Sequence, residues 1–325
     1  MRSKIAAIIP CYRVKAQILG VLARMGEEVD RIYVVDDACP EASGAHVQAN
    51  CRDPRVTVLR NAENLGVGGA VMAGYAAAMA DGCDILVKVD GDGQMDPALI
   101  PRFVRPIVNG QADYTKGNRF YDLTHIGQMP AVRLVGNAIL SFMAKLSTGY
   151  WNLFDTTNGY TALHARVARH LPMGKVSRRY FFETDMLFRL NIIRAVVVDV
   201  PMAAAYGDEK SNLRIGRIVG EFFVKHARNF FKRIAYNYFL RDMTVASLEL
   251  VFGAALFAFG LVFGGWHWWR SASVGTLTPF GTIMLSALPL LVGLQMLLAF
   301  VGFDVANVPR RPIHPDLPER EGANA

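Results

Sequence analysis

The chain has 325 residues, 52% of them hydrophobic, and a formal net charge of +7 at pH 7. This length allows one large domain or a domain with an appendage, and the mean hydropathy of +0.22 is high for a purely soluble protein. The basic balance indicates an anionic partner (nucleic acid, a phospholipid surface or a phosphorylated substrate), although basic loops beside membrane segments give the same total.

The cysteines and histidines argue against two kinds of site. Cys11, Cys39, Cys51 and Cys83 form no CxxC pair, and the seven histidines show no ligand spacing. Neither a structural zinc site nor a disulfide framework is therefore expected.

Residues 1–213 are predicted to form an α/β domain. Short apolar segments alternate with helical patterns, which is typical of βαβ units and a mainly parallel sheet with helices on both faces. The expected strands are Ile5–Ile9, Arg31–Val35, Val56–Leu59 and Asp84–Val89. The expected helices run from the first strand to about Met25 and from about Val67 to Ala80.

Four carboxylates follow these strands. Asp36 and Asp37 end the second strand, while Asp90 and Asp92 follow the fourth, within Asp90-Gly91-Asp92-Gly93-Gln94. Ligands of parallel sheets bind beyond the carboxyl ends of the strands. Because Mg²⁺ and Mn²⁺ prefer oxygen ligands, Asp90 and Asp92 are candidate metal ligands that would clamp a pyrophosphate leaving group.

The segment Asn64–Ala70 is rich in glycine and leaves two interpretations open. Its backbone N–H groups could bind phosphate at a helix start, or its glycines could allow close packing of helix on sheet. It matches neither GxGxxG nor a P-loop.

Residues 214–242 are predicted to form an amphipathic juxtamembrane helix. Apolar residues recur at helical spacing with basic residues between them, which is typical of helices lying on anionic headgroups. Packing of this helix on the domain core is the alternative.

Residues 243–306 are expected to contain two transmembrane helices, at about 245–267 and 281–303. Leu250–Trp269 and Ser271–Phe303 lack Asp, Glu, Lys and Arg, and roughly 20 apolar residues span a bilayer as a helix. Lys and Arg concentrate before the first helix and after the second, which predicts that both termini, and with them the N-terminal domain, are cytoplasmic. The tail, 307–325, contains four prolines and is expected to be disordered.

Several motifs give the chain a resemblance to family 2 glycosyltransferases of the GT-A fold. They are Ile8-Ile9-Pro10-Cys11-Tyr12, Val34-Val35-Asp36-Asp37, Asn64-Leu65-Gly66 and Asp90-Gly91-Asp92-Gly93-Gln94. Within that family residues 4–213 resemble the polyprenyl-phosphate hexosyltransferases, including the dolichyl-phosphate mannosyltransferase group.

The resemblance implies roles for individual residues. The nucleotide-sugar would be bound by Pro10, Tyr12, Asp36, Asp37, Asp90, Gly91, Asp92 and Gln94. The cofactor would be Mg²⁺ or Mn²⁺ on Asp90 and Asp92. The acceptor phosphate would be bound by Arg119, Arg133, Lys210 and Ser211, since guanidinium groups pair bidentately with phosphate.

Asp90, Asp92 and Asp185 are the candidate catalytic residues. Asp185, in Phe181-Phe182-Glu183-Thr184-Asp185, lies where relatives with hydroxyl acceptors place a general base. A lipid phosphate is already anionic and needs none, so we expect Asp185 or Glu183 to position rather than to deprotonate.

The chain departs from the family in its late loop, where Tyr206–Asn212 lacks the usual arginine and Lys210 could replace the charge. The resemblance implies an inverting enzyme that moves a hexose from GDP- or UDP-hexose to a polyprenyl phosphate at the bacterial inner membrane. Membrane lipids are expected partners, nucleic acid is not, and self-association is allowed. The alternatives are transfer to a hydroxyl of a lipid-linked or cell-envelope glycan, and a non-catalytic membrane scaffold.

Overall fold

The computed structural model describes residues 2–121, 131–203 and 215–318, with the side chains of 131–134 and 215–219 left aside. The chain divides into two compact units. The first comprises residues 1–230 together with 309–325, and the second comprises residues 231–308.

The described residues of the first unit form a seven-stranded sheet in the order β3-β2-β1-β4-β6-β5-β7. Among these described strands only β6 runs antiparallel to its neighbours. The strands are β1 Ile5–Cys11, β2 Arg31–Asp36, β3 Val56–Arg60, β4 Ile85–Lys88, β5 Tyr114–Asn118, β6 Thr161–His164 and β7 Val197–Pro201. The four strands predicted from the sequence are confirmed, and so is the α/β class.

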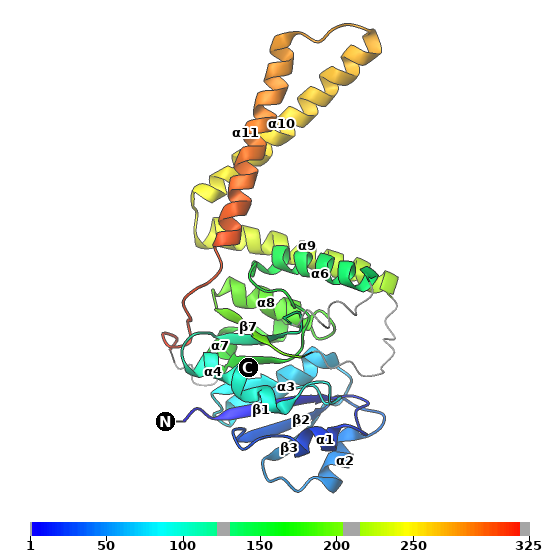
Figure 1. Cartoon of the computed structure of the whole chain (residues 1–325), viewed down its shortest axis with the longest axis vertical. Helices are drawn as coiled ribbons and strands as arrows, with labels where there is room; N and C mark the ends of the chain where they lie inside the picture. The colour runs from blue at the N-terminus through cyan, green and yellow to red at the C-terminus, as the bar shows by residue number, and fades with distance from the viewer. Residues whose placement is uncertain (1, 122–130, 204–214, 319–325) are drawn as a thin grey trace. The chain divides into compact units, whose positions relative to one another are not determined.

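Helices cover both faces of this sheet (Figure 1). Because successive strand residues point to opposite faces, Ile9 of β1 joins a core cluster with Phe103, while Ile8 points the other way, toward Gly74 of α3. A Cβ on Gly74 would lie 2.4 Å from Ile8 Cγ2, so the small residues of α3 allow close packing.

The helices are α1 Ile18–Ala23, α2 Ser43–Asn50, α3 Gly66–Ala80, α4 Ile100–Val108, α6 Ala131–Thr148, α7 Ala165–His170, α8 Phe182–Ile192 and α9 Ile215–Ala235, with short 3₁₀ turns η1 Pro97–Leu99 and η2 Met173–Lys175.

The first helix is shorter than predicted, since α1 ends at Ala23 rather than near Met25. Ends of helices are the least determined part of a periodic pattern, because the last turn lacks intrahelical partners.

Helix α9 uses two of its faces. His226 is buried and its Nδ1 lies 2.8 Å from Ser147 Oγ of α6, and Asn229 contacts Asp185 of α8. Phe223 and Val224 are exposed on another side. One face of α9 therefore packs on the domain, as the alternative interpretation of residues 214–242 has it, and another face is apolar and exposed. Contact of this helix with a membrane stays a prediction.

The second unit is a helical hairpin of α10 (Val245–Val274) and α11 (Phe280–Ala306), preceded by a π-helical turn, Tyr236–Arg241. Both helices are long and apolar enough to cross a membrane, with mean hydropathies of 2.1 and 2.2 in their most apolar windows. They pack against each other over part of their length and separate toward the connecting loop (Figure 1). Gly260 permits this approach, because a Cβ there would lie 2.8 Å from Leu290 N.

A buried ion pair lies within the second unit. Arg233 donates from both Nη atoms to Asp304, at 2.5 and 3.0 Å, and the Tyr238 hydroxyl donates to the same carboxylate at 2.6 Å. A carboxylate in the last turn of a helix is unfavourable on its own, so Arg233 supplies the compensating charge.

The predicted disorder of the tail is wrong for its described part. The backbone N–H groups of Ile313 and His314 donate to the buried carboxylate of Asp113, and His314 Nδ1 lies 2.8 Å from the same group. The His314 ring also stacks on His164, with centroids 4.3 Å apart. A polar, proline-rich composition indicated disorder, but one buried carboxylate partner is enough to fix this segment.

Candidate active site

The carboxyl ends of the central parallel strands bring the candidate residues to one edge of the sheet. Ile8 pairs with Lys88 and Cys11 pairs with Asp36, so β1, β2 and β4 end at similar levels. Pro10 is half-buried there, and Tyr12 is 44% exposed with the Arg13 guanidinium 5.5 Å from its ring centroid. The exposed ring is available to stack on a base.

Asp36 and Asp37 are buried and shape the loops at this edge. Asp36 accepts hydrogen bonds from Cys39 N at 2.8 Å and Gly44 N at 2.6 Å. Asp37 accepts from Asn61 Nδ2 at 2.7 Å, Leu65 N at 2.9 Å and Gly66 N at 2.8 Å. Their carboxylates therefore fix the loops at this edge of the sheet, and the predicted contact of Asp36 and Asp37 with a nucleotide would compete with these backbone and side-chain donors.

The glycine-rich start of α3 serves close packing. Gly66 N donates to Asp37, and Gly68 N donates to Arg178 O at 2.8 Å. A Cβ on Gly68 would lie 2.5 Å from Ser177 O. Because these N–H groups already have protein acceptors, the packing interpretation of this segment holds, and phosphate binding at this helix start is not supported.

The Asp90–Gln94 turn follows β4 directly. Asp92 Oδ1 accepts from Gln94 N at 2.9 Å, which closes the turn, and Gly93 adopts a φ of +81°, where a side chain would be strained. Gly91 is buried, and a Cβ there would lie 3.2 Å from Val14 Cγ2. Glycine at positions 91 and 93 thus allows a tight turn directly after β4.

Asp90 and Asp92 fit a hard divalent cation bound jointly with a substrate. Among the described residues no group of three or more His, Cys, Asp or Glu side chains could hold a metal ion. Mg²⁺ in enzymes is often held by one or two carboxylates and substrate phosphates. The donor set therefore suits Mg²⁺ or Mn²⁺ only when phosphate oxygens complete the coordination.

Lys88, which was not predicted from the sequence as a site residue, lies beside Asp90. Its Nζ lies 2.8 Å from Asp90 Oδ1 and 3.5 Å from Glu183 Oε1, and it donates to Gly159 O at 3.1 Å. Burial alone would lower the pKa of this ammonium, but Asp90 and Glu183 raise it above its ordinary value. A lysine inside an otherwise apolar strand, Ile85–Val89, was the signal that could have identified it.

A second buried lysine lies two strands away. Lys116 of β5 donates from Nζ to the carbonyl oxygen of Asn158. Its burial lowers the pKa to about 8, against the opposing influence of Glu183 and Asp155. Lys88 and Lys116 both pair in register with Thr161 of β6, so the two ammonium groups flank that strand.

Arg119 follows the carboxyl end of β5. Its Nε and Nη2 donate to the two oxygens of Asp155, at 2.8 and 3.0 Å. The sequence predicted a phosphate contact for Arg119, and in the structure a buried carboxylate already orients its guanidinium. Arg133 lies in α6, with its side chain outside the described residues, as are Lys210 and Ser211.

Asp185 is buried and engaged with its own surroundings. It accepts from Ser177 N at 2.9 Å, Arg189 Nε at 3.0 Å and Asn229 Nδ2 at 3.2 Å. This arrangement agrees with a positioning role. Glu183, two residues earlier on α8, is the carboxylate that reaches the Lys88–Asp90 pair.

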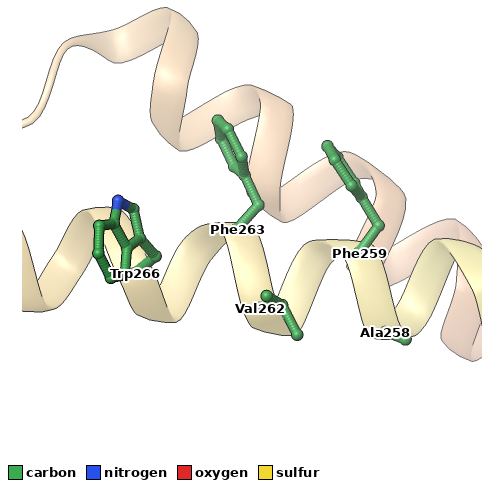
Figure 2. Close-up of a pocket in the computed structure, with 5 residues that line it drawn as sticks. All are labelled: Ala258, Phe259, Val262, Phe263 and Trp266. Atoms are coloured by element: carbon green, nitrogen blue, oxygen red, sulfur yellow. The ribbon is translucent and has the colours of Figure 1, made fainter.

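An apolar hollow on α10 has a different character. It is lined by Ala258, Phe259, Val262, Phe263 and Trp266 (Figure 2). Phe259 and Phe263 extend from the same side of the helix with rings stacked at 5.3 Å. These lining residues include no charged group, so the hollow suits a lipid chain and not a nucleotide.

Comparison with known proteins extends these observations. Residues 6–171 match the model of glycosyl transferase family 2. The chain is 30% identical over 229 residues to an undecaprenyl-phosphate mannosyltransferase of Micrococcus luteus, covering 69% of this chain and 93% of the relative. It is 27% identical to a UDP-N-acetylglucosamine–dolichyl-phosphate N-acetylglucosaminyltransferase of Methanococcus voltae, covering 61% of this chain and 84% of that one.

Solved structures show a similar fold. The glucosyl-3-phosphoglycerate synthase of Mycobacterium tuberculosis, crystallised with Mn²⁺, UDP and glucosyl-3-phosphoglycerate, superposes with a TM-score of 0.54 at 17% identity. The superposition covers 71% of this chain and 80% of that one. At this identity the likeness concerns the fold alone.

Proposed function

The chain belongs to glycosyl transferase family 2, and from that membership we propose that it transfers a hexose from GDP- or UDP-hexose to a polyprenyl phosphate at the cytoplasmic face of a membrane. The relative matched over 93% of its length is an undecaprenyl-phosphate mannosyltransferase, and a second uses dolichyl phosphate. Both acceptors named are polyprenyl phosphates, which is the acceptor class proposed here.

The observation that carries this proposal is the spacing of two charged groups along one sheet edge. Asp90 and Asp92 follow β4, and Arg119 follows β5, with β6 between these strands. Neighbouring strands lie about 4.8 Å apart, which separates the two strand ends by about 10 Å. One hexose ring fits between a donor diphosphate at the carboxylates and an acceptor phosphate at the guanidinium.

Asp90 and Asp92 would hold Mg²⁺ or Mn²⁺ together with the donor diphosphate. When bound, the cation supplies positive charge that stabilises the departing nucleoside diphosphate. Neighbours of the same fold were crystallised with Mn²⁺ or Mg²⁺, which supports this choice of metals. Tyr12 would stack on the base at the end of β1.

The acceptor would attack without a protein base. An oxygen of the lipid phosphate is anionic near neutral pH, and in-line attack on the anomeric carbon would invert its configuration. The engagement of Asp185 with Ser177, Arg189 and Asn229 supports this acceptor class, because a hydroxyl acceptor needs a general base with an accessible oxygen. Arg119, oriented by Asp155, would bind the lipid phosphate, with Arg133, Lys210 and Ser211 as further candidates.

Three apolar surfaces support action at a membrane. The hairpin α10–α11 is suited to span it. On α6, Val135, Ile139 and Phe142 are each more than half exposed at a spacing that places them on one face. Phe223 and Val224 are exposed on α9. Exposed apolar stripes of this kind bury into the headgroup boundary.

A donor and metal screen tests the proposal. Detergent-purified protein would meet GDP- and UDP-hexoses, Mg²⁺ or Mn²⁺ and a short polyprenyl phosphate, with the Asp92→Asn variant as control. A metal-dependent glycolipid that the variant does not form is expected. Donor hydrolysis without glycolipid would indicate a hydroxyl acceptor on a glycan, and no donor binding would indicate a scaffold.

A further inference from the structure

Lys88 connects the proposed cation site to helix α8. Its side chain is 1% exposed, whereas those of Asp90 and Glu183 are 28% and 12% exposed. The ammonium lies 2.8 Å from Asp90 Oδ1 and 3.5 Å from Glu183 Oε1, so it bridges a candidate metal ligand and a carboxylate 95 residues away in the chain.

The surroundings of Lys88 hold the ammonium in this position. Its Nζ also donates to Gly159 O at 3.1 Å. A Cβ on Gly159 would lie 2.4 Å from Lys88 Nζ and 3.0 Å from Asp90 Oδ2, so only glycine leaves room for the pair. The lysine is thus fixed between two carboxylates and one carbonyl group.

The charges at this site have a direct consequence for a divalent cation. Asp90 is the carboxylate that Lys88 contacts, and the ammonium offsets its charge before any metal arrives. A cation approaching Asp90 and Asp92 is therefore repelled by a fixed positive charge at close range. The negative charge of a diphosphate, delivered with the cation, would compensate for that repulsion.

We propose that Lys88 is a positioning residue that holds Asp90 and offsets its charge, so that the divalent cation binds tightly only together with the diphosphate of the donor. This inference rests on the proposed function, since it concerns the same cation and diphosphate. It assigns Lys88 no contact with the reacting atoms.

Glu183 acts in the opposite electrostatic direction. Its carboxylate also pairs with the Lys88 ammonium, and this negative charge weakens the effect of the ammonium on Asp90. Loss of the Lys88 charge should strengthen binding of the cation without nucleotide, whereas loss of the Glu183 charge should weaken it. General damage to the site would weaken binding in both variants.

The experiment measures Mn²⁺ binding to the full-length protein in detergent, by the electron paramagnetic resonance signal of free Mn²⁺. The variants are Lys88→Met and Glu183→Gln. The matched control is Lys4→Met, which removes a lysine just before the start of β1, whereas the proposed cation site lies beyond the carboxyl ends of the strands. Each is measured with Mn²⁺ alone and with Mn²⁺ plus UDP or GDP. Thermal unfolding of each variant establishes that it is folded.

The expected result is a difference in sign. In the native chain UDP or GDP should tighten Mn²⁺ binding by about tenfold or more. Lys88→Met should tighten nucleotide-free binding by about tenfold and reduce the nucleotide effect, while Glu183→Gln weakens nucleotide-free binding and Lys4→Met changes neither.

Two results would overturn the inference and are distinguishable from each other. If the native chain shows nucleotide-dependent Mn²⁺ binding but Lys88→Met weakens it as Glu183→Gln does, or leaves it unchanged, the role of Lys88 is wrong while the proposed function stands. If the native chain binds no Mn²⁺ even with UDP and GDP, the metal-dependent function itself is contradicted, and this inference with it.

Discussion

Arg119 and Asp155 form a two-point ion pair in which Nε and Nη2 of the guanidinium donate to separate carboxylate oxygens, at 2.8 and 3.0 Å. The Asp155 side chain is 2% exposed and that of Arg119 is 35% exposed. A buried carboxylate thus fixes the plane of a guanidinium at the edge of the sheet where the acceptor phosphate is proposed to bind.

Replacement of Arg119 by lysine should raise the KM for polyprenyl phosphate by about ten- to a hundredfold, because an ammonium cannot reproduce the planar two-point contact. The KM for the nucleotide-sugar should change by no more than about twofold, because the proposed donor contacts follow β1, β2 and β4 and do not include Arg119. Steady-state kinetics with each substrate varied in turn measure both, with Arg102→Lys, an exposed residue of α4, as the control. A change confined to the donor KM would contradict the assignment.

Substitution of Gly260 by alanine should destabilise the hairpin by about 1 to 3 kcal/mol, as overpacking does. A Cβ there would meet Leu290 N and Ser286 O at 2.8 Å. Gly265→Ala on the same helix is the matched control, because a Cβ at Gly265 meets nothing within 4 Å. Thermal unfolding in detergent compares the two, and equal midpoints would show that α10 and α11 do not pair this closely.

Replacement of His314 by alanine should release the tail from Asp113. Trypsin would then cleave after Arg310 at least several-fold faster, since local opening exposes the chain to proteases. The control is Asp316→Asn, which removes only the exposed ion pair with Arg311. Mass spectrometry of the fragments follows the cleavage, and rapid cleavage of the native chain would mean that the tail is not held.

Acidification should destabilise the first unit, the one that contains the sheet, through His226. Burial lowers the pKa of this imidazole to about 4, below the value of about 6.5 expected in the unfolded chain. The unfolded state therefore binds the proton first, and stability falls as the pH drops from about 6.5 toward 4. Between pH 7 and pH 5 the loss is about 1 to 2 kcal/mol after allowance for partial solvation.

Denaturant unfolding at pH 7 and pH 5 tests this effect by comparison with His226→Gln. Glutamine keeps a polar group near Ser147 without the titration, so the variant should lose less stability than the native chain between the two pH values. The control His46→Gln alters a partly exposed histidine of α2 and should retain the native pH dependence. An unchanged dependence in His226→Gln would remove His226 as its source.

The sequence predicted the features that depend on local pattern. The strands that end in Asp36 and Asp90 were recognisable from short apolar runs, and the two long apolar helices from composition alone. Such elements can be predicted because residues that are neighbours in the sequence favour the same backbone conformation. The α/β class followed from their alternation.

The features that the sequence did not predict depend on partners far apart in the chain. Lys88 meets Gly159 and Glu183 only because β6 runs antiparallel beside β4 and α8 packs on the same face. Asp113 meets His314 across 201 residues. Asp37 was recognised from the sequence as part of a motif. Its hydrogen bonds with the backbone of Leu65 and Gly66, however, could not be predicted, because they depend on the fold.

The acceptor assay tests the central claim most directly. A radiolabelled nucleotide-hexose would be offered with a short polyprenyl phosphate and, in parallel, with the matched polyprenol that lacks the phosphate. The account predicts labelled lipid from the phosphate alone, lost in the Asp92→Asn variant. Labelled lipid from the polyprenol at a comparable rate, or label transferred only to a glycan hydroxyl, would contradict a lipid phosphate as the acceptor.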